Sequence, residues 1–260
     1  MSEFLNQSSG QFLVYLLILV RVSSILVFAP VFGSRSVPLQ VKAGISLLLA
    51  VLLSMTIKPP AVESALGLGF GLLILGEVLI GAAVGYVANL IFEAIQLAGE
   101  LSGLQMGFGI VNVIDPMSSV QVSLLGQLKF MLAVLLFLAI NGHHMIVESI
   151  GQSFRIIPPG QVPLVSDLGP HLTDLFGEML VLGVKLAAPV VVALLMASLV
   201  EGVIARTVPQ INILIVGFGV RIAFGLFVLM LSIGFILGIS GRSFIALPEQ
   251  LAQLFGILRP

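Results

Sequence analysis

The chain has 260 residues, of which 58% are hydrophobic and 9% charged, and its mean hydropathy is +1.21. Ordinary soluble domains carry roughly a quarter charged residues, so this composition indicates a membrane protein. The net charge of −1 gives no reason to expect nucleic acid as a partner, and the absence of cysteine excludes disulfides and thiolate metal sites.

Six apolar segments follow one another along the chain, and most reach the ~20 residues that a helix needs to cross a bilayer. They are residues 12–32, 41–57, 66–92, 122–140, 180–204 and 213–239, the second being short. Prolines mark most of the breaks, because proline ends helices or starts turns. Short connectors favour antiparallel neighbours, so the pattern predicts an all-α protein of membrane-associated helical hairpins.

The polar parts of the sequence lie between and after these segments. The connector 141–175 is the longest and the most polar, and within it residues 172–178 resemble the start of the fifth helix, with Thr173 and Asp174 as N-cap candidates. The tail from Arg242 is mildly amphipathic and is expected to lie at the membrane surface. No basic region precedes the first segment, so we interpret it as a retained helix and not as a signal peptide.

One connector differs from the others because it is apolar and rich in glycine. Residues 103–117 contain no Lys or Arg. A solvated connector would be polar and turn-forming, whereas this one suits a segment that packs into a cavity or lines a constriction. We therefore expect 99–117 to form a plug loop, with 104–113 closing a pore. The expected gating residues are Gly103, Met106, Gly107, Phe108, Gly109, Ile110, Val111 and Met117, with the polar residues Glu100, Gln105 and Asp115 beside them.

Glycine is abundant, and several pairs of glycines are four residues apart: Gly67 and Gly71, Gly81 and Gly85, Gly99 and Gly103, and Gly234 and Gly238. This spacing lets helix backbones approach closely, so we favour tight helix packing over a ligand role. Gly99, Gly103, Gly107 and Gly109 are also candidates for hinges around the apolar loop, since glycine tolerates bends.

Charged residues inside the apolar segments need an explanation, because a charge at mid-bilayer costs at least ~2.5–3.5 kcal/mol on insertion scales. One interpretation is a proton or ion relay, for which Glu77 is the best candidate. The other is pairing within a protein assembly, which we favour because Arg and Lys dominate the set whereas relays usually use Asp, Glu or His. The residues expected to be paired in this way are Arg21, Glu77, Lys185, Glu201, Arg206 and Arg221.

Sites for chemistry are not evident in the sequence. His143, His144, Glu148 and His171 fall in one region, but the HExxH pattern is absent and adjacent histidines on a helix point about 100° apart, which disfavours a metal site. There is no GxSxG and no P-loop, and the GxG at Gly107 lacks the rest of a dinucleotide fingerprint. We expect no catalytic, cofactor-binding or metal-binding residues, and no enzymatic activity.

Several stretches together resemble the FliR/SctT family, the export-gate proteins of type III secretion, over essentially the whole chain. They are Ala29-Pro30-Val31-Phe32-Gly33 with Val37-Pro38, Gln96-Leu97-Ala98-Gly99-Glu100 with Gln105-Met106-Gly107-Phe108-Gly109 and Asp115-Pro116, Asn141-Gly142-His143-His144, and Ala187-Ala188-Pro189 with Arg206-Thr207-Val208-Pro209-Gln210-Ile211-Asn212. Each stretch is weak alone, and their order and spacing carry the resemblance.

The resemblance implies one family domain over residues 1–260, present as a single copy with FliP and FliQ in a helical, ring-like gate. It also implies FlhB as a neighbour, contact with membrane lipid, and a place in the bacterial inner membrane at the flagellar basal body. Unfolded flagellar proteins would pass through the centre, and the apolar loop would match the family's plug. A flexible apolar seal of this kind excludes water and ions by dewetting.

Two other classes of protein remain as alternatives. A small-solute secondary transporter often has internal repeats and broken helices; repeats are not apparent here, although Pro189 could break the fifth helix. An intramembrane hydrolase would need a catalytic set, which the sequence lacks.

Overall fold

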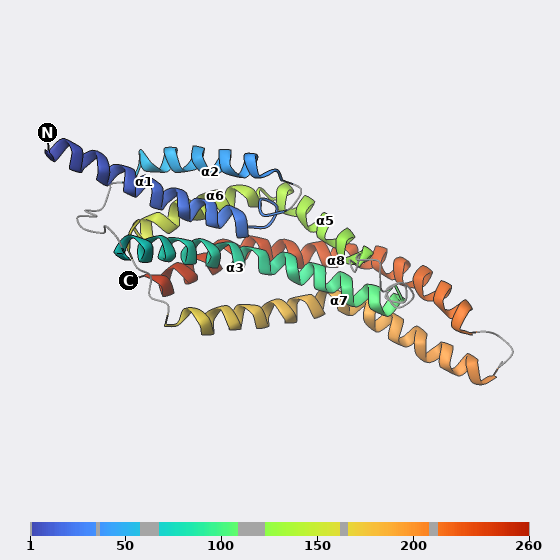
Figure 1. The fold of residues 1–260 in the computed structure, drawn as a ribbon. Helices are drawn as coiled ribbons and strands as arrows, with labels where there is room; N and C mark the ends of the chain where they lie inside the picture. Colours follow the sequence, from blue (N-terminus) through green and yellow to red (C-terminus); the bar gives the residue numbers. More distant parts are fainter. Residues whose placement is uncertain are drawn as a thin grey trace. The chain divides into compact units, whose positions relative to one another are not determined.

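The computed structural model describes residues 2–34, 37–57, 68–108, 123–161, 166–207 and 213–259. Within these ranges the regular structure is entirely helical (Figure 1). The helices are α1 (Ser2–Phe28), α2 (Leu39–Ser54), α3 (Leu68–Met106), α5 (Leu124–Ala139), α6 (Gly142–Ile156), α7 (Leu168–Thr207) and α8 (Ile213–Leu258). The predicted all-α class is confirmed.

The chain divides into two compact units. The first comprises Met1–Leu90, Asn141–Leu175 and Ile245–Pro260, and the second comprises Ile91–Ile140 and Phe176–Phe244. Helices α3, α7 and α8 each contribute residues to both units. The division is therefore not one of successive domains along the sequence.

The core of the first unit contains one face of α1. Buried apolar residues recur every three or four positions along this helix, as one face of an α-helix requires; they are Val14, Leu17, Ile18, Val22 and Ile25. Helix α3 approaches this helix closely through two glycines. A Cβ at Gly81 would lie 2.8 Å from the backbone oxygen of Arg21, and one at Gly85 would lie 2.8 Å from the carbonyl carbon of Phe28. The predicted close packing at this glycine pair is what the structure shows.

The chain turns directly after α1, within the same unit. Val31 has a φ of 67°, a left-handed conformation that is unfavourable for a β-branched side chain. The ammonium group of Lys42, in α2, donates to the backbone oxygens of Gly33 (3.1 Å) and Ser34 (3.0 Å). This contact holds the end of the turn against the first turn of α2.

The second unit has an aromatic core. Phe92 of α3, Phe130 and Phe137 of α5, and Phe244 of α8 have ring centroids 4.9–5.8 Å apart in their contacting pairs. The rings are tilted or edge-to-face, which are the favoured arrangements of aromatic pairs. Phe92, Phe137 and Phe244 are fully buried. The cluster holds α3, α5 and α8 together around one centre.

Three helices are long and apolar enough to cross a membrane by length and composition. They are Gly69–Met106, Leu168–Thr207 and Val216–Leu258, and α5 with α6 would make a fourth if the two form one broken span. The described part of α1 from Phe12, and α2, are shorter apolar helices. The structure thus agrees with the expected membrane class, although fewer than six segments reach the spanning length within the described residues.

Several expected breaks are in fact helical. The connector 141–175 contains α6, and α7 already begins at Leu168, before the expected start at 172–178. Pro189 lies inside α7 and does not interrupt it, and the tail from Arg242 continues α8 through Pro248. Apolar periodicity alone missed these extensions because long helices can hold polar turns and a single proline when tertiary packing supports them.

The break between α5 and α6 falls at the expected end of the fourth apolar segment and is explained by Asn141. This residue has a φ of 59° and precedes the first turn of α6. Asparagine tolerates the left-handed conformation better than most residues, which allows the chain to change direction here without glycine.

Candidate functional site

The C-terminal end of α3 carries the first residues of the expected plug. Gly107 has a φ of 92°. Its N–H donates to the backbone oxygen of Leu104 at 3.0 Å, and the N–H of Phe108 donates to that of Gly103 at 3.0 Å. These two bonds make a Schellman motif, which ends a helix in a defined direction and needs glycine at the left-handed position. The direction in which the chain leaves α3 is therefore set by Gly107.

Close contacts with α5 hold this helix end in place. A Cβ at Gly99 would lie 2.7 Å from the backbone nitrogen of Gly126, and one at Gly103 would lie 2.8 Å from the hydroxyl of Ser123. Ser123 is also the N-cap of α5, since its hydroxyl accepts from the N–H of Gly126 at 3.2 Å. The two glycines thus lie in a helix–helix contact, and residues 99–106 of the expected loop are helix.

Met106 is wholly buried and packs on α8. A Cβ on Gly225 would lie 3.0 Å from its sulfur atom, so the methionine occupies the space that this glycine leaves. Leu104, two residues earlier, is 66% exposed. Of the expected gating residues, Gly103, Met106, Gly107 and Phe108 are described, and Met106 acts here as an anchor of the helix end. Gly109, Ile110, Val111, Met117 and the neighbouring Asp115 lie outside the described residues.

The polar residues expected beside the plug lie on the last turns of α3. The side-chain amide of Gln96 donates to a carboxylate oxygen of Glu100 at 3.2 Å, one helical turn apart. Glu100 and Gln105 are both partly buried. The contact between Gln96 and Glu100 orients the carboxylate along the α3 surface.

A buried lysine on α5 contacts α3 about one turn before the end of α3. This lysine was not among the charges that the sequence pointed to. Lys129 of α5 is 2% exposed, and its ammonium group donates to the backbone oxygen of Ala98 (3.1 Å) and to the hydroxyl of Ser102 (3.1 Å) on α3. The signal that singled out Arg21, a charge inside an apolar run, also exists at Lys129. It ties α5 to the same part of α3 that the glycines bring close.

In the first unit, Arg21 and Glu77 form a buried ion pair through the Arg21 Nε and a Glu77 carboxylate oxygen. The Arg21 Nη1 donates to the backbone oxygens of Ser153 (3.2 Å) and Ile157 (2.8 Å), and the N–H of Gly160 donates to Glu77 Oε1 at 2.8 Å. The guanidinium group also lies 4.2 Å from the ring centre of Phe154, in a cation–π contact. This network joins α1, α3, α6 and the segment after α6.

A second ion pair joins α7 and α8 in the second unit. Arg221 Nε and Nη2 both donate to Glu201 Oε2, at 2.8 and 2.5 Å. Four of the six intramembrane charges therefore find partners in their own chain, whereas partners on neighbouring subunits were expected. Lys185 and Arg206 are exposed on α7, and their pairing in an assembly stays a prediction.

The histidine region shows no arrangement suited to a metal. The rings of His143 and His144 lie 4.3 Å apart, centre to centre, at the start of α6. In the ranges that the structure describes, no three His, Cys, Asp or Glu residues are grouped so that they could hold an ion. The polar and packed features described above are therefore the end of α3, Lys129 and the two ion pairs, and not a metal site.

Comparison with known proteins identifies the family. Residues 12–246 match the family model of bacterial export proteins, family 1. The chain belongs to this family. It is 33% identical to the flagellar biosynthetic protein FliR of Bacillus subtilis (strain 168), over 98% of this chain and 99% of that one. It is 35% identical to FliR of Escherichia coli (strain K12), over 80% and 79% of the two chains, and 32% identical to FliR of Aquifex aeolicus (strain VF5), over 87% and 88%.

These matches confirm the resemblance drawn from the motifs. The matched range contains all the helices of the second unit up to Phe244, the α3 end and both ion pairs. As a bacterial export protein, the chain belongs to a family of export components and not of enzymes, which is what the sequence analysis expected.

Proposed function

We propose that this chain is a subunit of the flagellar type III protein export gate, in which one copy joins FliP and FliQ to form the channel for unfolded flagellar proteins. FlhB is its neighbour at the cytoplasmic side, and the complex lies in the inner membrane at the basal body. Support comes from family membership, from relatives named flagellar biosynthetic proteins that are matched over 79–99% of their length, and from three helices of membrane-spanning length.

The observation that carries the gating role is the anchored end of α3. The Schellman motif at Gly107 directs the chain out of the helix, and Met106 and Gly103 are packed on α8 and α5. The next residues, 109–117, are apolar apart from Asn112 and Asp115 and contain no Lys or Arg. We propose that these residues close the pore, and that the packed helix end gives them a rigid base. An apolar seal blocks ions because a dry constriction excludes their hydration shells.

The test separates closure of the pore from assembly of the gate. Deletion of residues 109–117 leaves the packed part of α3 intact. It should raise ion conductance through the complex of this chain with FliP and FliQ in lipid bilayers. The double variant Ile110→Ser, Val111→Ser keeps the loop length and should also leak, because polar side chains let water into the seal. The matched control Ile110→Val, Val111→Ile keeps the apolar character and should conduct like the wild type.

Assembly is followed in the same samples by co-purification of FliP and FliQ and by native mass. An intact complex whose conductance stays at the wild-type value in both leaky variants would contradict the plug. Failure of the wild-type chain to co-purify with FliP and FliQ would contradict the gate itself.

A further inference from the structure

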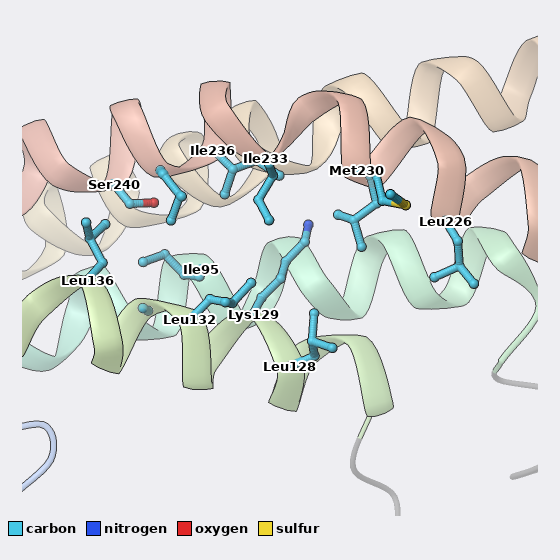
Figure 2. Close-up of a pocket in the computed structure, with 13 residues that line it drawn as sticks. Ile95, Leu128, Lys129, Leu132, Leu136, Leu226, Met230, Ile233, Ile236 and Ser240 are labelled. Atoms are coloured by element: carbon cyan, nitrogen blue, oxygen red, sulfur yellow. The ribbon is translucent and has the colours of Figure 1, made fainter.

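A cavity of about 310 Å³ lies in the second unit between α5 and α8, with α3 behind it (Figure 2). Its wall is aliphatic: Leu132 and Leu136 come from α5, Ile233 and Met230 from α8, and Ile95 from α3. Met230 is 73% exposed whereas Ile95 is 2% exposed, so the cavity has a buried floor and an open side. The open side belongs to helices whose outer faces are apolar.

The floor of this apolar cavity holds a positive charge. Lys129 lines it, is 2% exposed, and uses two of its N–H donors on neutral acceptors, the backbone oxygen of Ala98 and the hydroxyl of Ser102. No carboxylate is among the contacts of this ammonium group in the described part of the chain. A buried charge that meets only neutral acceptors lacks the compensation that an anion provides.

Ser240 is a second polar group in the same cavity. It lies on α8, is 1% exposed, and its hydroxyl has no hydrogen-bond partner among the described residues. Figure 2 shows its oxygen directed toward the space between α5 and α8. Buried hydroxyl groups are nearly always hydrogen-bonded, so this one indicates that a polar atom of an occupant belongs nearby.

Two features of the cavity suit a small amphiphile: its wall is aliphatic, and its buried floor carries the polar groups of Lys129 and Ser240. A single aliphatic chain is narrow enough to enter and matches the leucine, isoleucine and methionine wall. Its polar end must be acidic to compensate Lys129.

We propose that this cavity binds one aliphatic chain of an acidic amphiphile, with the acidic group at Lys129. The hydrocarbon chain lies between α5 and α8 against Leu132 and Ile233. Where the molecule carries a second polar group, as a glycerol lipid does, that group accepts from the Ser240 hydroxyl. The acidic group is the carboxylate of a fatty acid or the phosphate of an anionic lipid. The site is separate from the α3 end and does not depend on the plug.

The experiment uses the full chain in its detergent-solubilised complex and photoreactive probes. Palmitic acid with a diazirine on its chain should label peptides of α5 and α8 around Leu132 and Met230. Palmityl alcohol with the same diazirine has the same tail and no charge, and should label them at least about tenfold less, as expected for loss of a hydrogen bond to a charged group. Diazirine-bearing phosphatidylglycerol tests the lipid source: labelling by it alone assigns the phosphate, and labelling by palmitic acid alone assigns the free acid.

Lys129→Met removes the charge and keeps an aliphatic side chain, and should abolish the preference for acid over alcohol. Lys185→Met is the matched control, because Lys185 lies exposed on the apolar helix α7. The preference of this variant for acid over alcohol should equal that of the wild type. Equal labelling by acid and alcohol in the wild type, or an unchanged preference in Lys129→Met, would overturn the proposal. So would labelling of the isolated chain that disappears in the assembled complex, since a protein partner would then fill the cavity.

Discussion

Arg21 and Glu77 lie 56 positions apart in the sequence and are both completely buried. Nearly every polar atom of the two side chains nevertheless has a hydrogen-bond partner. The guanidinium group meets one carboxylate, two backbone oxygens and one aromatic ring, and the carboxylate meets a backbone N–H as well. A relay would need a path for protons or ions, whereas this arrangement fixes both charges in place. At this position, the geometry favours a structural role for the pair.

Removing either partner alone should destabilise the first unit. Glu77→Leu leaves the Arg21 charge buried without a carboxylate, and Arg21→Met leaves the Glu77 carboxylate buried without a guanidinium group. Each change should lower the free energy of unfolding by about 3–5 kcal/mol. The double variant removes both charges and should lose much less than the sum of the two single losses. Thermal unfolding of the full chain in detergent measures the three values, and strictly additive losses would show that the two side chains do not act as a pair.

The sequence pointed to Arg21, Glu77, Glu201 and Arg221 as charges that need partners, because apolar surroundings penalise an unpaired charge. It could not say which charges meet, since the pairs join helices that lie far apart along the chain. Lys129 carried the same signal and was overlooked. Its neutral acceptors, a backbone oxygen and a serine hydroxyl, have no signature in the sequence.

At the scale of the element, the glycines of α3 show which four-residue spacings lead to close contact with a neighbouring helix. The helix has 39 residues, and its glycines do different things along its length. Gly81 and Gly85 face α1, Gly99 and Gly103 face α5, and a Cβ at Gly71 would meet nothing within 4 Å. The four-residue spacing predicted close packing correctly at these two pairs. At Gly234 and Gly238 of α8 it did not, because a Cβ at either position would meet nothing within 4 Å. The partner helices became known only from the structure.

Gly99→Ala should loosen the contact between α3 and α5. The added Cβ would lie 2.7 Å from backbone atoms of Gly126 and Leu125, which cannot rotate away, so we expect a loss of about 1–3 kcal/mol in the free energy of unfolding. Gly71→Ala on the same helix is the matched control and should be neutral or stabilising by up to about 1 kcal/mol, because alanine favours the helix and meets no neighbour. Denaturation in detergent compares the two, and equal stability of both variants would contradict a close contact at Gly99.

The long helices α7 and α8 are the elements that the sequence described least well. Pro189 suggested a break in the fifth helix, and the mildly amphipathic tail from Arg242 suggested a segment at the membrane surface, whereas α7 and α8 continue through these positions. Proline removes one backbone hydrogen bond, a local loss that packing on both sides can outweigh. Pro38 marked the start of α2 correctly, because proline acts there on the backbone directly. The end of α3 was not located, since the helix runs to Met106 whereas the loop was expected from residue 99.

At the scale of the whole molecule, the described chain leaves large apolar side chains uncovered. Met230 and Leu231 on α8 are 73% and 71% exposed, and Leu199 and Val203 on α7 are 64% and 63% exposed. Apolar surface of this extent must be covered by lipid or by other proteins. An export protein that works with other components of its apparatus fits this surface.

The native mass of the detergent-solubilised protein tests whether lipid or other proteins cover these apolar faces. Co-expression with FliP and FliQ should give one large hetero-oligomer with a single copy of this chain, and expression alone should give a poorly behaved, aggregating sample, since its apolar faces then lack partners. A stable monomer or symmetric homo-oligomer in the absence of FliP and FliQ would instead favour a transporter that works by itself.

The sequence by itself determined the membrane class, the helical architecture and the unusual apolar segment after α3. These follow from composition, apolar periodicity and local backbone chemistry, which act within a few residues of one another along the chain. The export family was indicated separately, by the resemblance of several motifs in their order and spacing. The tertiary structure alone decided that Arg21 meets Glu77, that Gly99 meets Gly126, that Met106 anchors a helix end, and that Lys129 lies in the floor of a cavity. Such contacts join residues from different helices, and their energies depend on distance and burial in space, which no local pattern encodes.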